Sequence, residues 1–287
     1  MKPRGGDTAP MGKGAARCAF AHSKERKNAM KQAQYSFSTG ALFPYESEDA
    51  LQMIRNAGFD YAELMPQAIS DASEAATRKF EKTGIRLASI HYPLVMFGVL
   101  YTAHRTMRED GRAFSRDLLT MGQRMGCRVL VVHPHNPSYP GYEELLEKPV
   151  VDNLLWLADE CGKRDILMAM ENSPYTCSTA EKLTAYVKEL GHPNIRPMVD
   201  TTEAREADQD PAAFIRACPP CHLHMSDYLG SIKHLPAGEG DTDWADVKDA
   251  LGDYQGFYTL EPAYKFYLSD TQEKIRKGYE FLCEHFA

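Results

Sequence analysis

The chain has 287 residues, of which 43% are hydrophobic and 25% are charged, a balance typical of a folded globular protein. No apolar run approaches the roughly 18 residues that a membrane-spanning helix needs, so we expect no transmembrane segment. The net charge is −7, but residues 1–33 contain eight Lys or Arg against two acidic side chains, which leaves −13 on the remainder. With this negative charge, residues 34–287 are a poor electrostatic match for nucleic acid.

Residues 1–33 are basic, lack hydrophobic periodicity and contain no secretory apolar core. We interpret them as a disordered leader or as an extended start before an initiator at Met30; a targeting peptide is the alternative. From residue 34 a regular pattern begins, and we predict one domain over residues 34–287.

The predicted elements alternate strictly between strand and helix. In chain order, the predicted strands are Tyr35–Ser38, Tyr61–Leu64, Ile85–His91, Arg128–His133, Ile166–Glu171, Ile195–Asp200, Cys221–Met225 and Phe257–Glu261. The helices that follow them are Glu48–Ala57, Ala72–Lys82, Gly111–Met125, Val150–Lys163, Ala180–Leu190, Pro211–Ala217, Trp244–Leu251 and Asp270–His285.

Local signals support several of these boundaries. Gly58 and Gly84 follow predicted helices, where glycine is favoured, and Thr179 is placed to cap the helix that starts at Ala180. Pro197 lies inside the sixth strand, which is unusual for a sheet interior and makes the start of that strand ambiguous.

Eight strand–helix units in about 250 residues are the number that closes a (β/α)8 TIM barrel. The strands are short and almost continuously apolar, as parallel strands covered by helices are. An open doubly wound sheet is the alternative, but the turn after the first strand lacks its usual Gly-rich phosphate-binding sequence. We therefore predict a single (β/α)8 barrel.

The seven cysteines are scattered and odd in number, which fits reduced thiols in a cytoplasmic protein better than a disulfide framework. Cys218-Pro-Pro-Cys221 has the spacing of a redox pair or of half a zinc site. No second such pair accompanies it, and a strand-like run follows where a redox motif would need a helix. We interpret it as a loop that enters a strand.

The seven strands after the first all have, at or next to their last position, a residue that can bind a metal or move a proton. In a parallel barrel these ends surround one mouth, where active sites lie. Clustered carboxylates and imidazoles suit a divalent cation such as Mn²⁺, Zn²⁺, Co²⁺ or Mg²⁺. A lone histidine or glutamate there is more often structural, so the prediction depends on the joint pattern. The residues are Glu63, His91, His133, Glu171, Asp200, His224 and Glu261.

His222 lies two positions before His224 and shares its strand face, so it is an alternative ligand.

At these positions the chain resembles the xylose isomerase-like TIM-barrel superfamily, which includes sugar-phosphate isomerases and epimerases, ketose 3-epimerases and endonuclease IV. The resemblance runs from about Tyr35 to the C-terminus. The motifs that carry it are Ser-Ile-His91-Tyr-Pro, Val-Val-His133-Pro, Met-Glu171-Asn, Val-Asp200-Thr, His224-Met-Ser-Asp227, His234-Leu-Pro-Ala-Gly-Glu239-Gly and Leu-Glu261-Pro.

The resemblance implies one central metal and an outer group of site residues. The implied metal ligands are Glu171, Asp200, His224 and Glu261. His91 and His133, together with Glu171, match a pair that holds a second metal in the endonuclease branch, and sugar-acting relatives often keep such histidines for substrate hydroxyls. The candidates for substrate binding or for a second metal are His91, His133, His234, Glu63, Glu203 and Glu239.

Four positions depart from the patterns of the relatives. Glu203 stands where the endonuclease has a histidine, and Ile232 stands where it has an aspartate two residues before the histidine matched by His234. Leu94 replaces an aromatic residue that is expected three positions after the first histidine. Gly230 stands where the ketose 3-epimerases have a substrate-binding arginine. The first two departures remove ligands of a third metal and argue against a nuclease.

The predicted function is a metal-dependent isomerase or epimerase that acts on a sugar, a sugar phosphate or a keto-polyol through an enediolate. A cation that binds adjacent carbonyl and hydroxyl oxygens would acidify the neighbouring C–H. Glu171 and Glu261 would form the acid/base pair. Alternatively, both are only metal ligands and the base is another residue such as Glu63.

Two other enzyme classes stay open as alternatives: a lyase or dehydratase that uses the same enediolate, and an apurinic-site endonuclease. We expect a small carbohydrate as the partner, and the sequence leaves open whether it is phosphorylated. The apolar start of the connection from Pro93 to Gly111 suits a lid or a contact within a homo-oligomer, and an ordinary core helix is the alternative.

Overall fold

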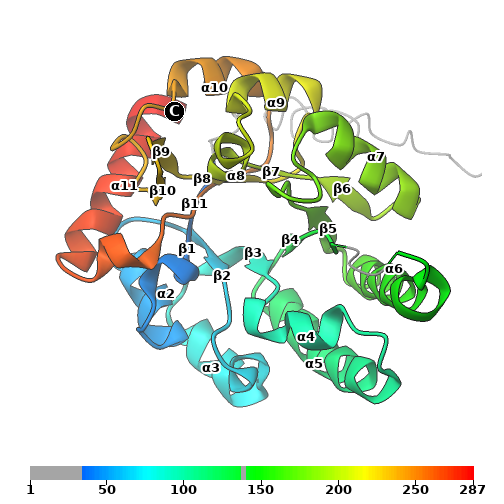
Figure 1. Cartoon of the computed structure of the whole chain (residues 1–287). Coiled ribbons are helices and arrows are strands. Elements are labelled where there is room, and N and C mark those ends of the chain that lie inside the picture. The colour runs from blue at the N-terminus through cyan, green and yellow to red at the C-terminus, as the bar shows by residue number, and fades with distance from the viewer. Residues whose placement is uncertain (1–33, 137–139) are drawn as a thin grey trace, which may run out of the picture. The chain divides into compact units, whose positions relative to one another are not determined.

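The computed structural model describes residues 34–136 and 140–287. The leader predicted over residues 1–33 lies outside this part of the chain. The described residues form a ring of parallel strands with helices on its outside (Figure 1). The barrel strands are β1 (Gln34–Ser38), β2 (Tyr61–Leu64), β3 (Arg86–His91), β4 (Val129–Val132), β5 (Leu167–Met170), β6 (Ile195–Pro197), β7 (Val199–Asp200), β8 (Leu223–Met225) and β11 (Phe257–Leu260).

The order of the strands shows how the ring closes. The hydrogen-bonded order is β6-β5-β4-β3-β2-β1-β11-β8-β7, so β6 and β7 stand at its two ends. These two segments are consecutive pieces of one strand, separated only by Met198. Pro197 lacks an N–H, but its carbonyl accepts a hydrogen bond from the Cys221 amide at 2.9 Å, and the Met198 amide donates to Met170 at 2.9 Å. The predicted (β/α)8 barrel is confirmed, with its sixth strand interrupted after the proline.

The outer helices each bury one apolar face against the strands. Their bounds are α2 (Ser47–Asn56), α3 (Glu74–Lys82), α5 (Arg105–Arg124), α6 (Lys148–Gly162), α7 (Ala180–Leu190), α9 (Pro211–Ala217), α10 (Trp244–Leu251) and α11 (Thr271–Phe286). Thr179 caps α7 as predicted, because its side chain accepts a hydrogen bond from the Lys182 amide at 3.3 Å. No helix in the described ranges has the length and apolarity needed to cross a membrane.

Shorter helical segments fill the connections between these elements. They are η1 (Thr39–Leu42), η2 (Ile69–Ala72), η3 (Leu94–Met96), α4 (Phe97–Leu100), η4 (Glu143–Glu147), α8 (Thr201–Glu206) and η5 (Tyr264–Tyr267). The connection that starts at Pro93 therefore contains η3 and α4, in which Leu94 and Val95 are exposed while Leu100 is buried.

Two elements differ from the sequence prediction. The helix predicted from Gly111 begins six residues earlier, at Arg105, and Gly111 lies buried inside it. A Cβ at Gly111 would lie 2.8 Å from the carbonyl oxygen of Val99, so this glycine permits a close approach of two helices rather than marking a helix end. The loop predicted after the seventh strand contains an antiparallel hairpin, β9 (Asp227–Leu229) with β10 (Ile232–Leu235). Gly230 turns this hairpin with a φ of 62°.

The barrel interior has an apolar part and a polar part. Val129, Val131, Ala169 and Met198 form a small buried cluster of their own, separate from the main core between strands and helices. Polar side chains from the strands are also fully buried, among them Glu63, Ser89, His222, His224 and Thr259. Burial of this many polar groups is costly unless they pair with one another or with a cation.

Candidate metal centre

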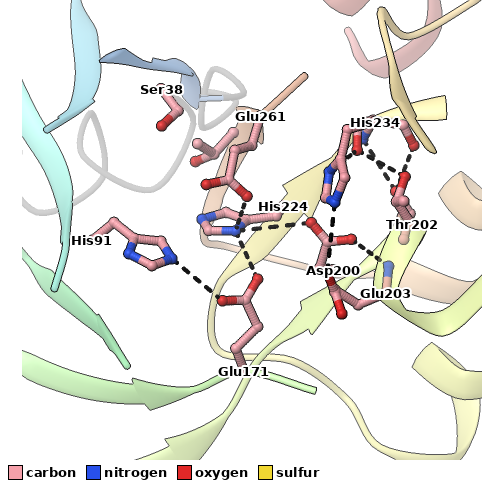
Figure 2. Close-up of polar contacts among 12 residues, drawn as sticks. Ser38, His91, Glu171, Asp200, Thr202, Glu203, His224, His234 and Glu261 are labelled. Carbon is pink, nitrogen blue, oxygen red and sulfur yellow. Dashed lines mark hydrogen bonds and ion pairs between the residues drawn. The ribbon is translucent and has the colours of Figure 1, made fainter. Parts of the chain in front are cut away.

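Four strand ends place the predicted metal ligands at one point of the mouth. Asp200 is the last residue of β7, His224 lies within β8, and Glu171 and Glu261 directly follow β5 and β11. The Nδ1 atom of His224 lies 2.9 Å from Glu171 Oε1, 2.8 Å from Glu261 Oε2 and 3.9 Å from Asp200 Oδ2 (Figure 2). One donor atom from each of the four residues lies within 4.8 Å of the others.

The donor set fits a divalent cation, and Asp200 shows why. Its Oδ1 accepts a hydrogen bond from the Glu203 amide at 2.7 Å, whereas its buried Oδ2 has no hydrogen-bond partner. Burial raises the pKa of Asp200 to about 8, and the charges of Glu171, Glu203 and Glu261 add to this against an opposing effect of His234. A cation would satisfy the orphan oxygen, and carboxylates with one imidazole are ligands that Mn²⁺, Zn²⁺ and Co²⁺ accept.

The electrostatic environment of His224 also indicates that the site fits a divalent cation. Burial lowers the pKa of His224, but the carboxylates of Glu261, Glu63 and Glu171 outweigh this effect and raise the pKa well above its usual value. The negative potential therefore favours a positive charge at this place. A divalent cation would supply that charge directly.

A second group of possible ligands shares Glu171. His133 Nε2 lies 3.0 Å and His91 Nε2 lies 3.6 Å from Glu171 Oε2, and the two histidine nitrogens are 3.1 Å apart. The carbonyl of Tyr92 accepts a hydrogen bond from His91 Nδ1 at 2.9 Å, which directs Nε2 toward Glu171. Burial lowers the pKa of His91, but the hydrogen bond to Glu171 and the nearby carboxylates raise it to about 9. These residues could hold a second cation or contact substrate hydroxyls.

Glu203 and His234 form a third group on the other side of the mouth. His234 Nε2 lies 3.5 Å from Glu203 Oε1, and His234 Nδ1 lies 3.1 Å from the Ser226 hydroxyl (Figure 2). Burial lowers the pKa of His234, but Glu203 and other carboxylates raise it to about 9. His234 has a φ of 50°, a strained value for a residue with a side chain and one that often marks a functional position.

Two of the predicted site residues, Glu63 and Glu239, lie outside these three groups. Glu63 is fully buried behind His224, whose Nε2 lies 2.9 Å from Glu63 Oε2. Glu239 is exposed on the turn after β10. The alternative ligand His222 is also fully buried, and its Nε2 lies 3.6 Å from Glu63 Oε2.

Residues of all three groups line a cavity of about 360 Å³, whose lining includes both polar and apolar side chains. Phe43 and Tyr264, which we call the apolar wall, both line the cavity, and their rings pack edge to face with centroids 5.3 Å apart. The pattern of polar strand ends does not indicate this wall, although Phe43 and Tyr264 lie close after the first and last strands, where mouth residues are expected. The lining residues are Gly40, Phe43, Met65, Gln67, His91, Leu94, His133, Glu171, Glu203, His234, Glu261, Pro262, Ala263 and Tyr264.

Fold and site together define a (β/α)8 barrel with a carboxylate–imidazole cluster able to hold a cation at its C-terminal mouth. The family model of the xylose isomerase-like TIM barrel matches residues 51–285, and the chain belongs to this family. The family resemblance seen in the strand-end motifs is thereby confirmed.

Among curated relatives, the D-psicose 3-epimerase of Ruminiclostridium cellulolyticum is 22% identical over 229 residues, which cover 74% of this chain and 76% of the relative. The D-psicose 3-epimerase of Enterocloster bolteae is 32% identical over 118 residues, or 39% of this chain and 38% of the relative.

Solved structures of similar fold include D-psicose 3-epimerase with D-tagatose from Clostridium cellulolyticum H10. Its TM-score is 0.70 at 16% identity, and the match covers 88% of this chain and 99% of that one. The 3-keto-D-glucoside 4-epimerase from E. coli gives a TM-score of 0.70 at 17% identity, with 88% and 100% covered. At identities of 16% and 17%, these similarities establish only the fold of the chain.

Proposed function

We propose that this chain is a metal-dependent sugar epimerase or isomerase in which Glu171 and Glu261 form the acid/base pair. The observation that carries the proposal is the position of these two glutamates. Both line the cavity, and both contact the same nitrogen of His224. The related D-psicose 3-epimerases support an epimerase in particular.

Glu171, Asp200, His224 and Glu261 would hold the cation. When bound, it would supply Lewis acidity toward the carbonyl and hydroxyl oxygens of a sugar. Glu261 is the better placed base, because its side chain is 14% exposed and His224 is its one ion-pair partner in the described residues. It would take the proton from the carbon next to the carbonyl, which leaves an enediolate. Return of a proton to the opposite face inverts that carbon.

Glu171 is held differently from Glu261. Its Oε1 contacts His224, and its Oε2 faces His133 and His91. Side-chain exposure of His133 is 32%, so this imidazole can exchange protons with solvent while it contacts Glu171. Glu171 with His133 is therefore suited to return the proton, which follows the general logic of acid/base catalysis.

The lining of the cavity favours an uncharged sugar over a sugar phosphate. No Lys or Arg is among the lining residues in the described part of the chain, and three glutamates are. A phosphate group in this field would meet like charges without a guanidinium or ammonium partner. We propose a free keto sugar or keto-polyol as substrate and a cytoplasmic location, which the free thiols of all six described cysteines fit.

The test is exchange of substrate C–H with D₂O after reconstitution with Mn²⁺, across ketoses, aldoses and keto-polyols. Glu261→Gln and Glu171→Gln should each lower exchange by roughly 10²- to 10⁴-fold, the range for a lost general acid or base. The matched control is Glu284→Gln, which changes an exposed glutamate on α11 outside the candidate site.

Product analysis separates the alternatives. A lyase or dehydratase would release water from the sugar, and a nuclease would incise abasic DNA. Absence of exchange with every sugar, or full exchange in Glu261→Gln, would overturn the proposal.

A further inference from the structure

Glu63 lies on the side of His224 that faces away from the cavity. It belongs to β2, is fully buried and does not line the cavity. Its Oε2 accepts a hydrogen bond from the Ser89 hydroxyl at 2.8 Å and lies 2.9 Å from His224 Nε2. The two nitrogens of His224 therefore have different surroundings: Nδ1 faces the proposed metal ligands and Nε2 faces Glu63.

We propose that Glu63 is a positioning residue for the metal centre. By accepting the Nε2 proton of His224, it fixes the imidazole tautomer whose Nδ1 lone pair points at Glu171, Asp200 and Glu261. This inference rests on the proposed metal-dependent function. A carboxylate behind a metal-binding histidine also makes the imidazole a stronger ligand, because it stabilises the positive charge that builds up on coordination.

The local backbone directs Glu63 to this place. Ala62 pairs with Leu87 of β3, but Glu63 pairs with Ser89, so β3 carries one extra residue, Ala88. A register shift of this kind changes which side chains face one another across the two strands. Here it places Glu63 beside the hydroxyl that hydrogen-bonds it.

The surroundings of Glu63 exclude a role as substrate base. His222 Nε2 lies 3.6 Å from the same Oε2 and 3.4 Å from the Thr259 hydroxyl, and all of these side chains are fully buried. Glu63 reaches the substrate only through His224. Its function is therefore to hold a ligand rather than to contact the reacting atoms.

The experiment measures Co²⁺ affinity by competition with a chromophoric chelator in wild type, Glu63→Gln and Ser89→Ala. Loss of a carboxylate behind a metal-binding histidine typically lowers affinity by about 10- to 100-fold, and we expect this for Glu63→Gln. Ser89→Ala should lower affinity less, because His224 keeps its acceptor. The matched control is Glu160→Gln. Glu160 is another buried glutamate, lies on α6 and pairs with Arg164, so this change should leave the Co²⁺ affinity unchanged.

A spectroscopic readout separates positioning from a general structural role. In the Zn²⁺-loaded wild type, labelled with ¹⁵N-histidine, His224 should carry a proton on Nε2 that exchanges slowly with solvent. In Glu63→Gln the proton should exchange faster. If Glu63→Gln does not fold, Ser89→Ala, which removes the hydroxyl that holds Glu63, should show a smaller acceleration of the same proton exchange.

The outcomes are distinct. A wild type that binds neither Co²⁺ nor Zn²⁺ would overturn the proposed function and this inference together. Metal binding that Glu63→Gln leaves unchanged, an equal loss in Glu160→Gln, or an unprotonated Nε2 in the loaded wild type would overturn the inference alone.

Discussion

Substitution of Asp200 by Asn should stabilise the metal-free protein while it removes metal binding. The Asn side chain keeps an oxygen for the hydrogen bond from the Glu203 amide, so the start of α8 stays capped. What changes is Oδ2, which is buried without a hydrogen-bond partner and lies near Glu171 and Glu261. An amide at this position carries no charge and can donate to a neighbouring carboxylate.

The magnitude follows from the cost of one unsatisfied buried polar group, which is about 1–3 kcal/mol. At a pH above the raised pKa of about 8, where Asp200 is ionised, we therefore expect the free energy of unfolding of Asp200→Asn in EDTA to exceed that of wild type by up to this amount. With metal at 1,000 times its dissociation constant, wild type gains about 4 kcal/mol by linkage and the order reverses. Urea unfolding with EDTA and with Mn²⁺ measures both differences.

The matched control is Asp227→Asn, the same substitution at another buried aspartate. Both oxygens of Asp227 accept hydrogen bonds: Gly238 N at 2.9 Å and Trp244 Nε1 at 3.1 Å to Oδ2, and the amides of Tyr228 and Thr242 at 3.0 and 3.1 Å to Oδ1. An amide nitrogen in place of either oxygen would face two donors. Loss of two charge-assisted bonds costs roughly 3–6 kcal/mol. If Asp200→Asn is destabilised in EDTA as Asp227→Asn is, the argument that Asp200 is unsatisfied without metal is refuted.

Three further predictions concern acid stability, packing and the apolar wall. Burial raises the pKa of Asp227, but hydrogen bonds from Thr242, Trp244 and Tyr228 outweigh this effect and lower the pKa below its usual value. The contribution of Asp227 to stability is therefore present above the unfolded pKa of about 3.9 and is lost as the pH falls through the lower folded pKa. Asp227→Asn should flatten this loss of stability in acid, as measured by urea unfolding between neutral and acidic pH. Gly111→Ala should destabilise the protein by about 1–3 kcal/mol in thermal unfolding, because the new Cβ would lie 2.8 Å from the carbonyl oxygen of Val99. Gly98→Ala is the control and should not destabilise the protein, because no atom lies within 4 Å of the position of its new Cβ. Phe43→Ala should raise KM more than it lowers kcat in the exchange assay, because Phe43 lines the cavity but has no group that can transfer a proton. An equal fall in kcat would contradict this.

The fold and the inner part of the site could be predicted from the sequence because both depend on local patterns. β2 and α7 have the predicted bounds, since their apolar spacing, flanking glycines and caps are encoded within a few residues. Glu171, Asp200, His224 and Glu261 meet because parallel strands of one barrel end at one mouth. This is a consequence of topology and requires no long-range contact to be known.

What the sequence did not reveal depends on contacts between distant segments. Gly111 has the local signature of a helix boundary, and only the nearby Val99 carbonyl explains why it lies within a helix. The apolar wall joins Phe43 to Tyr264, which are more than two hundred residues apart in the chain. Asp227 belongs to a motif beside the site, yet its side chain fixes the loop around Gly238 and Trp244 rather than a ligand.

Glu63 and Glu261 both contact His224, but barrel geometry gives them different environments. These environments suit the two glutamates to different functions. Strand register places Thr259 beside His224 and Glu63 beside Ser89, which forms a buried polar layer below the mouth. Glu261 follows the end of β11 and is therefore above that layer, where it reaches the cavity. A carboxylate in the lower layer can only orient His224, whereas one in the upper layer can also reach a substrate proton. The layer that each side chain occupies, rather than its residue type, thus separates the positioning role that we propose for Glu63 from the catalytic role that we propose for Glu261.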